Sequence, residues 1–137
     1  MTATNPRRIH IGNRNFNPSQ WTDFGWDDPR HGPQIKGEVA VIRDDGTSGS
    51  LAAGLWRTGH EIAGCESDGS CRVKYSAPLG DETMLLLEGQ AQLANDETGE
   101  IYHLEGGDVI GLPAGLPVTW TSQGPYLKLF RVTTRAA

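Results

Sequence analysis

Short apolar segments separated by glycine and proline occupy most of this chain, and this spacing is the feature that most limits its possible folds. The 137 residues include 18 glycines and 8 prolines. Because these residues interrupt helices and mark turns, the pattern predicts many short strands rather than a helical bundle. A chain of this length is expected to bury about two-thirds of its unfolded surface in one core. The sequence therefore predicts a single all-β domain.

The expected strands follow one another from residue 38 onward. Alternating or continuously apolar segments bounded by turn residues predict strands at 38–42, 51–56, 71–76, 82–87, 90–93, 101–104, 109–112, 118–121 and 126–133. The continuously apolar Met84–Leu87 is typical of a strand that is buried on both faces. Short turns between successive strands favour antiparallel pairing.

Two stretches have a residue spacing that resembles a known family. Between Gly69 and Gly89 the skeleton is Gly-x5-Tyr-x-Ala-x4-Glu-x6-Gly, and a second skeleton runs from Gly107 through Pro113 to Gly115. Both resemble the two sequence motifs of the cupin superfamily. The resemblance covers roughly residues 50 to 133 and is closest in kind to the small single-domain branch related to the cupin domains of ureidoglycine aminohydrolase and ethanolamine-utilisation proteins. It implies a jelly-roll β-barrel.

The histidines of both motifs are replaced in this sequence. Tyr75 and Ala77 stand at the two histidine positions of the first motif, and Val118 stands at that of the second. Of the metal ligands that the resemblance implies, the carboxylate of Glu82 alone is left. Since one carboxylate cannot hold a transition metal, we expect no metal and no other cofactor.

Glu82 is the candidate catalytic residue. The resemblance implies that it points into the barrel, where a carboxyl group is either paired and inert or has a pKa raised enough for general acid or base catalysis. Tyr75 is expected to donate a hydrogen bond to it or to a substrate. Lys128 is the expected partner of Glu82, in a structural salt bridge or in a pair for proton transfer or anion recognition. The expected substrate-binding walls are Trp56, Met84, Leu86, Val118 and Trp120.

The histidines and cysteines are weaker candidates. Solvation or a structural hydrogen bond is the favoured role of all four histidines, which are His10, His31, His60 and His103. Cys65 and Cys71 flank a short turn, so a disulfide is conceivable, but two free thiols are favoured in a reducing compartment.

Residues 1–35 have a different composition and match no family, so the chain divides into an N-terminal arm, 1–35, and a barrel, 36–137. The arm contains four aromatic residues, which are Phe16, Trp21, Phe24 and Trp26. Aromatic side chains are costly to expose, so we expect the arm to pack on the barrel. It would act as a structural cover or as a lid on the mouth of the cavity.

Charge and hydropathy limit the partners. A net charge of −5 and a pI near 5.3 argue against a nucleic-acid partner. No apolar stretch approaches the roughly 18 residues of a membrane span, and the first residues lack the apolar core of a signal peptide, so a cytoplasmic protein without a membrane partner is expected. The resemblance implies pairing of two barrels. The apolar residues Leu85 and Leu87, expected on the outer face, favour a homodimer.

These features predict a small-molecule enzyme that works without the usual histidine metal site. Glu82 would act as general acid or base in a non-redox reaction, which is isomerisation, dehydration, cyclisation or hydrolysis. One alternative is a non-catalytic cupin that binds or senses a small molecule. A second alternative is a metal-dependent cupin whose ligands lie outside the motifs, with Glu82 and His60 among them.

Overall fold

A computed structural model of the chain describes residue 9, residues 21–44, residue 46 and residues 49–136. These residues form ten strands, which are β1 (Thr22–Asp28), β2 (Gly32–Arg43), β3 (Gly49–Gly59), β4 (Cys71–Tyr75), β5 (Asp81–Glu88), β6 (Gln90–Asn95), β7 (Ile101–Glu105), β8 (Val109–Leu112), β9 (Val118–Ser122) and β10 (Tyr126–Ala136). The all-β prediction is confirmed. In this part of the chain no helix is long and apolar enough to cross a membrane.

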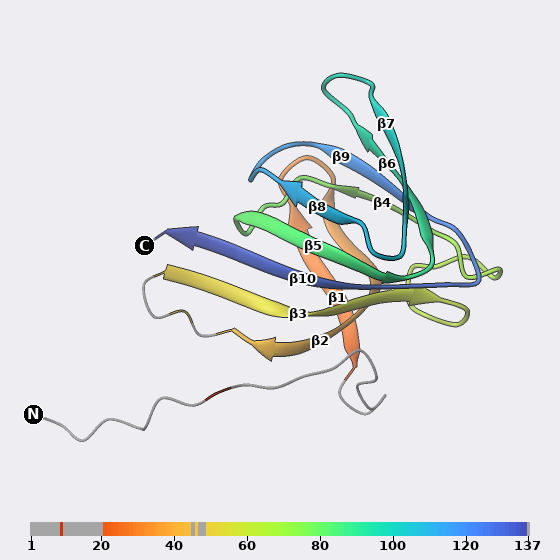
Figure 1. Ribbon diagram of the computed structural model, residues 1–137, viewed down its shortest axis with the longest axis horizontal. Coiled ribbons are helices and arrows are strands. Elements are labelled where there is room, and N and C mark those ends of the chain that lie inside the picture. Colours follow the sequence, from red (N-terminus) through yellow and green to blue (C-terminus); the bar gives the residue numbers. More distant parts are fainter. Residues whose placement is uncertain (1–8, 10–20, 45, 47–48, 137) are drawn as a thin grey trace, which may run out of the picture.

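The strands form two antiparallel sheets (Figure 1). The larger sheet has the order β1-β2-β3-β10-β5-β8 and the smaller one the order β4-β9-β6-β7. The main apolar core lies between them, because it combines residues such as Met84 and Leu129 of the larger sheet with Val73 and Trp120 of the smaller one. This arrangement is a cupin jelly roll, as predicted, with the two sheets not joined into a closed barrel.

Alternation along β4 and β5 points the motif residues into this core. In β4 the buried residues are Cys71, Val73 and Tyr75, with exposed residues between them. In β5 the side chains of Glu82, Met84 and Leu86 are buried in the same alternating manner. A period of two residues is what a strand with one inward face requires. The sequence phase from the motif was therefore enough to orient both strands.

The N-terminal region was expected as an arm packed on the barrel, and its residues 22–28 form a strand of the larger sheet. β1 pairs with β2 in register from Thr22↔Val39 to Asp28↔Gly32 and forms an edge of the larger sheet within the described residues. The predicted boundary between residues 35 and 36 consequently falls inside β2. The physical reason is that pairing with β2 satisfies the backbone donors and acceptors of residues 22–28, which a loosely packed arm would leave to solvent. Phe16 lies outside the described residues.

A second apolar cluster covers the outer face of the larger sheet. Its buried members are Trp21, Ala40 and Leu55, and the partly buried Leu87 and Phe130 pack against them. Part of the face that was expected to pair with a second barrel is thus covered by the chain itself. The homodimer stays a prediction.

The first motif owes its glycines to close backbone approach. Gly69 has φ +88°, and a Cβ there would lie under 3.0 Å from the backbone oxygen of Pro125. Gly89 has φ +96° and stands equally close to the backbone oxygen of Tyr126. Glycine is the residue that tolerates both the left-handed conformation and the missing space. The backbone just before β4 and just after β5 therefore packs directly against the backbone at the start of β10.

Candidate functional site

A cavity of about 30 Å³ lies between the two sheets and is bounded by Glu82. Its lining consists of Phe24, Trp56, Val73, Tyr75, Glu82, Met84, Trp120, Leu129 and Arg131. Because one water molecule needs roughly 10–15 Å³ of such space, the cavity of about 30 Å³ has room for about two or three waters or a chemical group of similar size. The walls are mostly apolar and aromatic, and the polar side chains gather on one side.

Glu82 is the most deeply buried charged residue of this lining. Its side chain has no exposed surface. Oε2 accepts a hydrogen bond from the hydroxyl of Tyr75, whereas Oε1 has no hydrogen-bond partner in the described structure. Burial raises the pKa of Glu82, and the opposing effects of Arg131 and of the Tyr75 hydrogen bond do not cancel this rise. The site therefore favours a protonated carboxyl group more than solvent does.

Tyr75 serves this site as a hydrogen-bond donor. It is 5% exposed at the end of β4, opposite Val118 of β9. Burial raises the pKa of its phenol far above the ordinary value; Arg131 opposes this rise and Glu82 adds to it. The hydroxyl hence stays protonated at physiological pH and donates a hydrogen bond to Oε2 of Glu82.

Arg131 is the cation of the cavity. It lies on β10, is 7% exposed, and its Nε is 3.8 Å from Oε1 of Glu82. This distance allows a Coulombic interaction but exceeds that of an N–H···O hydrogen bond. The guanidinium donates a hydrogen bond to Oγ1 of Thr133 at 3.3 Å and lies 4.7 Å from the centre of the Phe24 ring. One side of the guanidinium is therefore held while its other donors border the cavity.

The predicted pairing of Glu82 with Lys128 is corrected by this geometry. Lys128 and Arg131 are three positions apart on β10, so strand alternation turns their side chains to opposite faces. The Nζ of Lys128 lies 5.9 Å from the ring of Trp21 and 5.6 Å from that of Tyr126. A signal for Arg131 was present in the sequence: Leu127, Leu129 and Arg131 share one face of β10, and the first two are apolar core residues.

The expected substrate-binding walls are placed in two groups. Trp56, Met84 and Trp120 line the cavity. Leu86 and Val118 are buried in the core but do not line it, and Val118 instead borders a separate groove that β7 and β8 flank. Sequence reasoning missed Phe24 and Arg131 as parts of the site.

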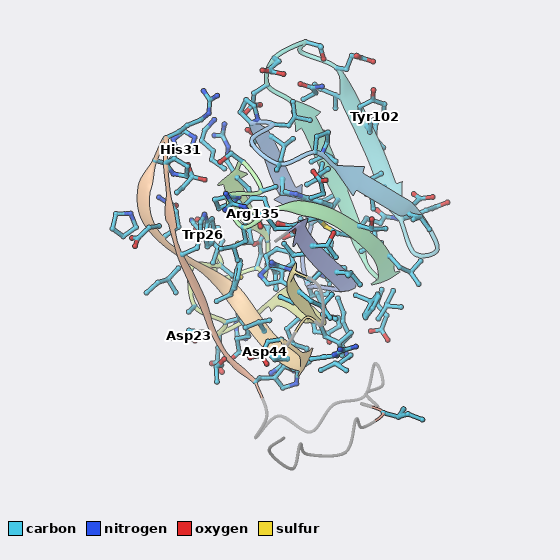
Figure 2. The ribbon with its side chains drawn as sticks, turned by 90° about the vertical axis from the view of Figure 1, so that its left-hand side faces the viewer. Asp23, Trp26, His31, Asp44, Tyr102 and Arg135 are labelled. Atoms are coloured by element: carbon cyan, nitrogen blue, oxygen red, sulfur yellow. The ribbon has the colours of Figure 1, made fainter. Side chains whose placement is uncertain are left out.

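β1 covers one side of the cavity. Phe24 lines it and stacks on Trp26 with ring centres 5.0 Å apart, and Trp26 meets the ring of Tyr75 edge-on at 5.5 Å. Figure 2 places Trp26 on the side of the β1–β2 hairpin that faces the rest of the molecule. The aromatic residues of this strand thus contact both Tyr75 and Arg131. Such contacts fit the lid that was one of the two roles expected for the N-terminal region.

Asp28 anchors the tip of this hairpin. Its carboxylate accepts hydrogen bonds from the backbone N–H of Arg30 at 2.8 Å and from Oγ of Ser76 at 3.3 Å. Burial acts to raise the pKa of Asp28, but the hydrogen bonds from Arg30, Trp26 and His31 together lower it. Since Ser76 directly follows Tyr75, the hydrogen bond between Ser76 and Asp28 holds the end of β1 close to Tyr75.

The two facing sheets, the glycine skeleton and the inward Glu82 define the class of fold, which is that of the cupins. Within that class, residues 64–130 match the EutQ-like cupin domain. This agrees with the small single-domain branch that the sequence resembles.

Solved structures support the fold at low sequence identity. An ethanolamine utilization protein Q from Salmonella typhimurium LT2 has a TM-score of 0.52 and 17% identity, with 86% of this chain and 98% of that chain covered. A protein of unknown function from Rhizobium leguminosarum has a TM-score of 0.55 and 19% identity, with 90% of this chain and 97% of that chain covered. The polyketide cyclase RemF from Streptomyces resistomycificus has a TM-score of 0.53 and 17% identity, with 72% of this chain and 65% of that chain covered. Identities of this size carry the fold and not the activity. No curated protein has significant sequence similarity to the chain.

The residues around Glu82 do not fit the metal ion that many cupins carry. Its neighbours are a phenol, Tyr75, and a guanidinium, Arg131, whose positive charge opposes a second cation. His31, His60 and His103 are exposed, and His10 lies outside the described residues. Among the described residues, no group of three or more His, Cys, Asp or Glu is arranged to hold a metal ion. The donor set thus gives no support to a site built from Glu82 and His60.

The two cysteines are free thiols with different environments. Cys71 is 1% exposed at the start of β4, and its thiol donates to the backbone oxygen of Gly64 at 3.5 Å. Burial, helped by the neighbouring Cys65, raises the pKa of Cys71 to about 12. A thiol of this kind is a poor nucleophile because little thiolate is present.

Ellman's reagent at pH 8 is therefore expected to react rapidly with a single thiol of the native protein, the partly exposed Cys65. Cys71 should react only after unfolding. The variant Cys65→Ser is the matched control and should show almost no rapid reaction. Rapid release of two equivalents of chromophore from the native protein would contradict the buried environment of Cys71.

Proposed function

We propose that this cupin is a small-molecule enzyme that performs non-redox acid–base chemistry with Glu82 as the proton carrier. The observation that supports this most is Oε1 of Glu82, which is buried at the edge of the cavity and has no hydrogen-bond partner among the described residues. An unsatisfied buried polar atom costs about 1–3 kcal/mol of stability, and such costs are typical of functional sites. A substrate group in the cavity would satisfy it.

The proton of neutral Glu82 belongs on Oε1, because Oε2 already accepts from Tyr75. In the proposed reaction Glu82 gives this proton to the substrate, either at a carbonyl oxygen that becomes an enol or at a hydroxyl that leaves as water. The remaining carboxylate takes the proton that the neighbouring carbon releases. Glu82 ends protonated, and no electron is gained or lost, so isomerisation, dehydration and cyclisation are the reaction types that fit.

Arg131 and Tyr75 have supporting roles in this scheme. When Glu82 has lost its proton, the guanidinium 3.8 Å away and the Tyr75 hydroxyl stabilise the carboxylate. Arg131 also borders the space where negative charge would develop on a substrate oxygen. Groups fixed in an apolar, buried site stabilise such charge more strongly than water-exposed groups do.

Exchange of carbon-bound hydrogen for deuterium tests the proposal without knowledge of the natural substrate. Pyruvate is a suitable first probe because its methyl protons exchange through the enol, and loss of its methyl signal in D₂O is followed by proton NMR. Chelator-treated protein is expected to accelerate exchange above the buffer rate, and Glu82→Gln to lower the acceleration by about 10²–10⁴-fold.

The exposed Glu105 provides the control, since Glu105→Gln makes the same chemical change away from the cavity and should exchange at the wild-type rate. Full exchange by Glu82→Gln protein would refute the role of Glu82. If neither pyruvate nor other small ketones and 2-oxo acids exchange while a ligand binds and is recovered unchanged, the non-catalytic binding protein becomes the better description.

A further inference from the structure

We infer that the cavity binds the carboxylate group of short-chain acids, with Arg131 as the anion-binding residue and Phe24 as the residue that limits ligand size. The inference rests on the proposed function because it names the substrate class of the same site.

The guanidinium group of Arg131 has N–H donors that make no hydrogen bond within the described residues. A guanidinium carries five N–H donors, of which one donates to Oγ1 of Thr133 at 3.3 Å and another interacts with the phenol oxygen of Tyr75, so further donors are left for a ligand. The contact with Glu82 at 3.8 Å is too long to use another. The ring of Phe24 covers the guanidinium and leaves its edge toward the cavity that both residues line. A carboxylate matches this edge because its two oxygens accept a pair of parallel N–H donors.

Glu82 supplies the complementary group. Oε1 is the unpartnered atom of a side chain with no exposed surface, and in the protonated state it is an O–H donor. A carboxylate that binds Arg131 also accepts this hydrogen bond. The other carboxyl oxygen, Oε2, already accepts a hydrogen bond from Tyr75.

The charge of the cavity favours a monoanion. The titratable or charged side chains that face it are Glu82 from β5, Tyr75 from β4 and Arg131 from β10. The other lining residues are apolar or aromatic, namely Phe24, Trp56, Val73, Met84, Trp120 and Leu129. With Glu82 and Tyr75 protonated, the net charge is that of Arg131 alone. A buried single charge is costly until an opposite charge joins it, so one carboxylate completes the site.

Size restricts the acid to a short chain. The cavity of about 30 Å³ is roughly one-fifth of the 150 Å³ apolar cavity that accepts benzene in another protein. Formate is comparable in size to the roughly two or three waters that fit. Acetate and pyruvate require the half-buried Phe24 to turn away from Arg131, and a benzene ring requires its removal.

Isothermal titration calorimetry with sodium formate and sodium acetate tests the inference, with sodium chloride at equal ionic strength as the control anion. Wild-type protein is expected to bind both carboxylates and to take up one proton when Glu82 is ionised in the free protein. Above the pKa of Glu82 the affinity then falls about tenfold per pH unit. Heats no larger than those of chloride would overturn the inference.

Variants assign the roles. Arg131→Gln is expected to weaken acetate binding by about 10–100-fold, and Arg131→Lys, which keeps the charge without the paired donors, to weaken it as well. Phe24→Ala should gain binding of benzoate, which wild-type protein rejects. Unchanged acetate affinity in folded Arg131→Lys protein, as judged by circular dichroism, would overturn the role of Arg131.

Glu82→Gln separates this inference from the proposed function. The amide mimics the protonated carboxyl group, so acetate binding should persist and lose its pH dependence, while pyruvate exchange is lost. Retained binding together with retained exchange would contradict the proposed function and leave the carboxylate site standing. Loss of binding, or a pH dependence that survives in Glu82→Gln protein, would contradict the inferred site itself.

Discussion

Arg131→Met is expected to lower the free energy of unfolding by about 3–5 kcal/mol at pH 8, the range observed when one partner of a buried ion pair is removed. Methionine fills a similar volume but removes the cation that stabilises the carboxylate form of the buried Glu82. Urea denaturation at several pH values measures the loss.

The loss should shrink as the pH falls. Burial already raises the pKa of Glu82 in the folded protein, and Arg131 is the main influence that lowers it. A carboxyl group with a raised folded pKa holds a proton that the unfolded chain has released, so it favours the folded state at acid pH. This contribution is lost as the pH rises through the folded pKa. Arg131→Met raises that pKa further and should be less harmful at pH 5 than at pH 8.

Two variants serve as controls for this prediction. Adding Glu82→Gln to Arg131→Met removes the buried charge and should recover a large part of the stability at pH 8, which a double-mutant cycle quantifies. Lys128→Met changes another buried cation on the same strand, on the face away from Glu82. Its effect should not change when Glu82→Gln is added. An equal loss for Arg131→Met at pH 5 and pH 8 would argue against an interaction with Glu82.

The second large effect is expected for Gly69→Ala, which should destabilise the protein by about 3 kcal/mol or more. The new Cβ would overlap the backbone oxygen of Pro125, and φ +88° is unfavourable for any residue with a side chain. The three nearest atoms all belong to the backbone of Pro125, which cannot move aside as a flexible side chain could.

Gly107→Ala is the matched control. It has a similar φ of +99°, but no heavy atom lies within 4 Å of the position that a Cβ would take there. Backbone strain alone should cost about 1–2 kcal/mol at this position. Thermal unfolding followed by circular dichroism compares the two variants, and equal shifts in Tm would show that close approach to Pro125 is not what requires glycine at position 69.

The parts of the fold that were predictable are those in which one physical rule dominates. β4 was predicted from its alternation, which matches its one buried face. β5 was predicted from its continuously apolar run as a strand buried on both faces, and its outer residues Leu85 and Leu87 are in fact only partly buried. The same phase brought Tyr75 and Glu82 to one cavity. β1 was not predicted, since Thr22–Asp28 contains one glycine and three aspartates, which are poor strand formers. Pairing with β2 and the packing of Phe24 and Trp26 outweigh that propensity.

The site was predictable only in part, for a related reason. Lys128 was chosen as the partner of Glu82 because it matches a lysine frequent in the family branch that the sequence resembles. The apolar neighbours Leu127 and Leu129 indicate instead which face of β10 is inward. Counting two residues on from Leu129 leads to Arg131. Phe24 had no local signal at all, because its position in the cavity depends on the pairing of β1 with β2.

The place of β1 at the edge of its sheet has a consequence for the kinetics of the site. Within the described residues β1 has a single strand neighbour, β2, and its tip is held by Asp28. Detaching it therefore breaks one ladder of hydrogen bonds and leaves the interior strands paired. Local opening of an edge segment requires less free energy than global unfolding. The exchange of a ligand would then require β1 to detach from β2. The residence time of a bound acid would be set by the free energy of this local opening rather than by the strength of the contacts between the acid and Arg131.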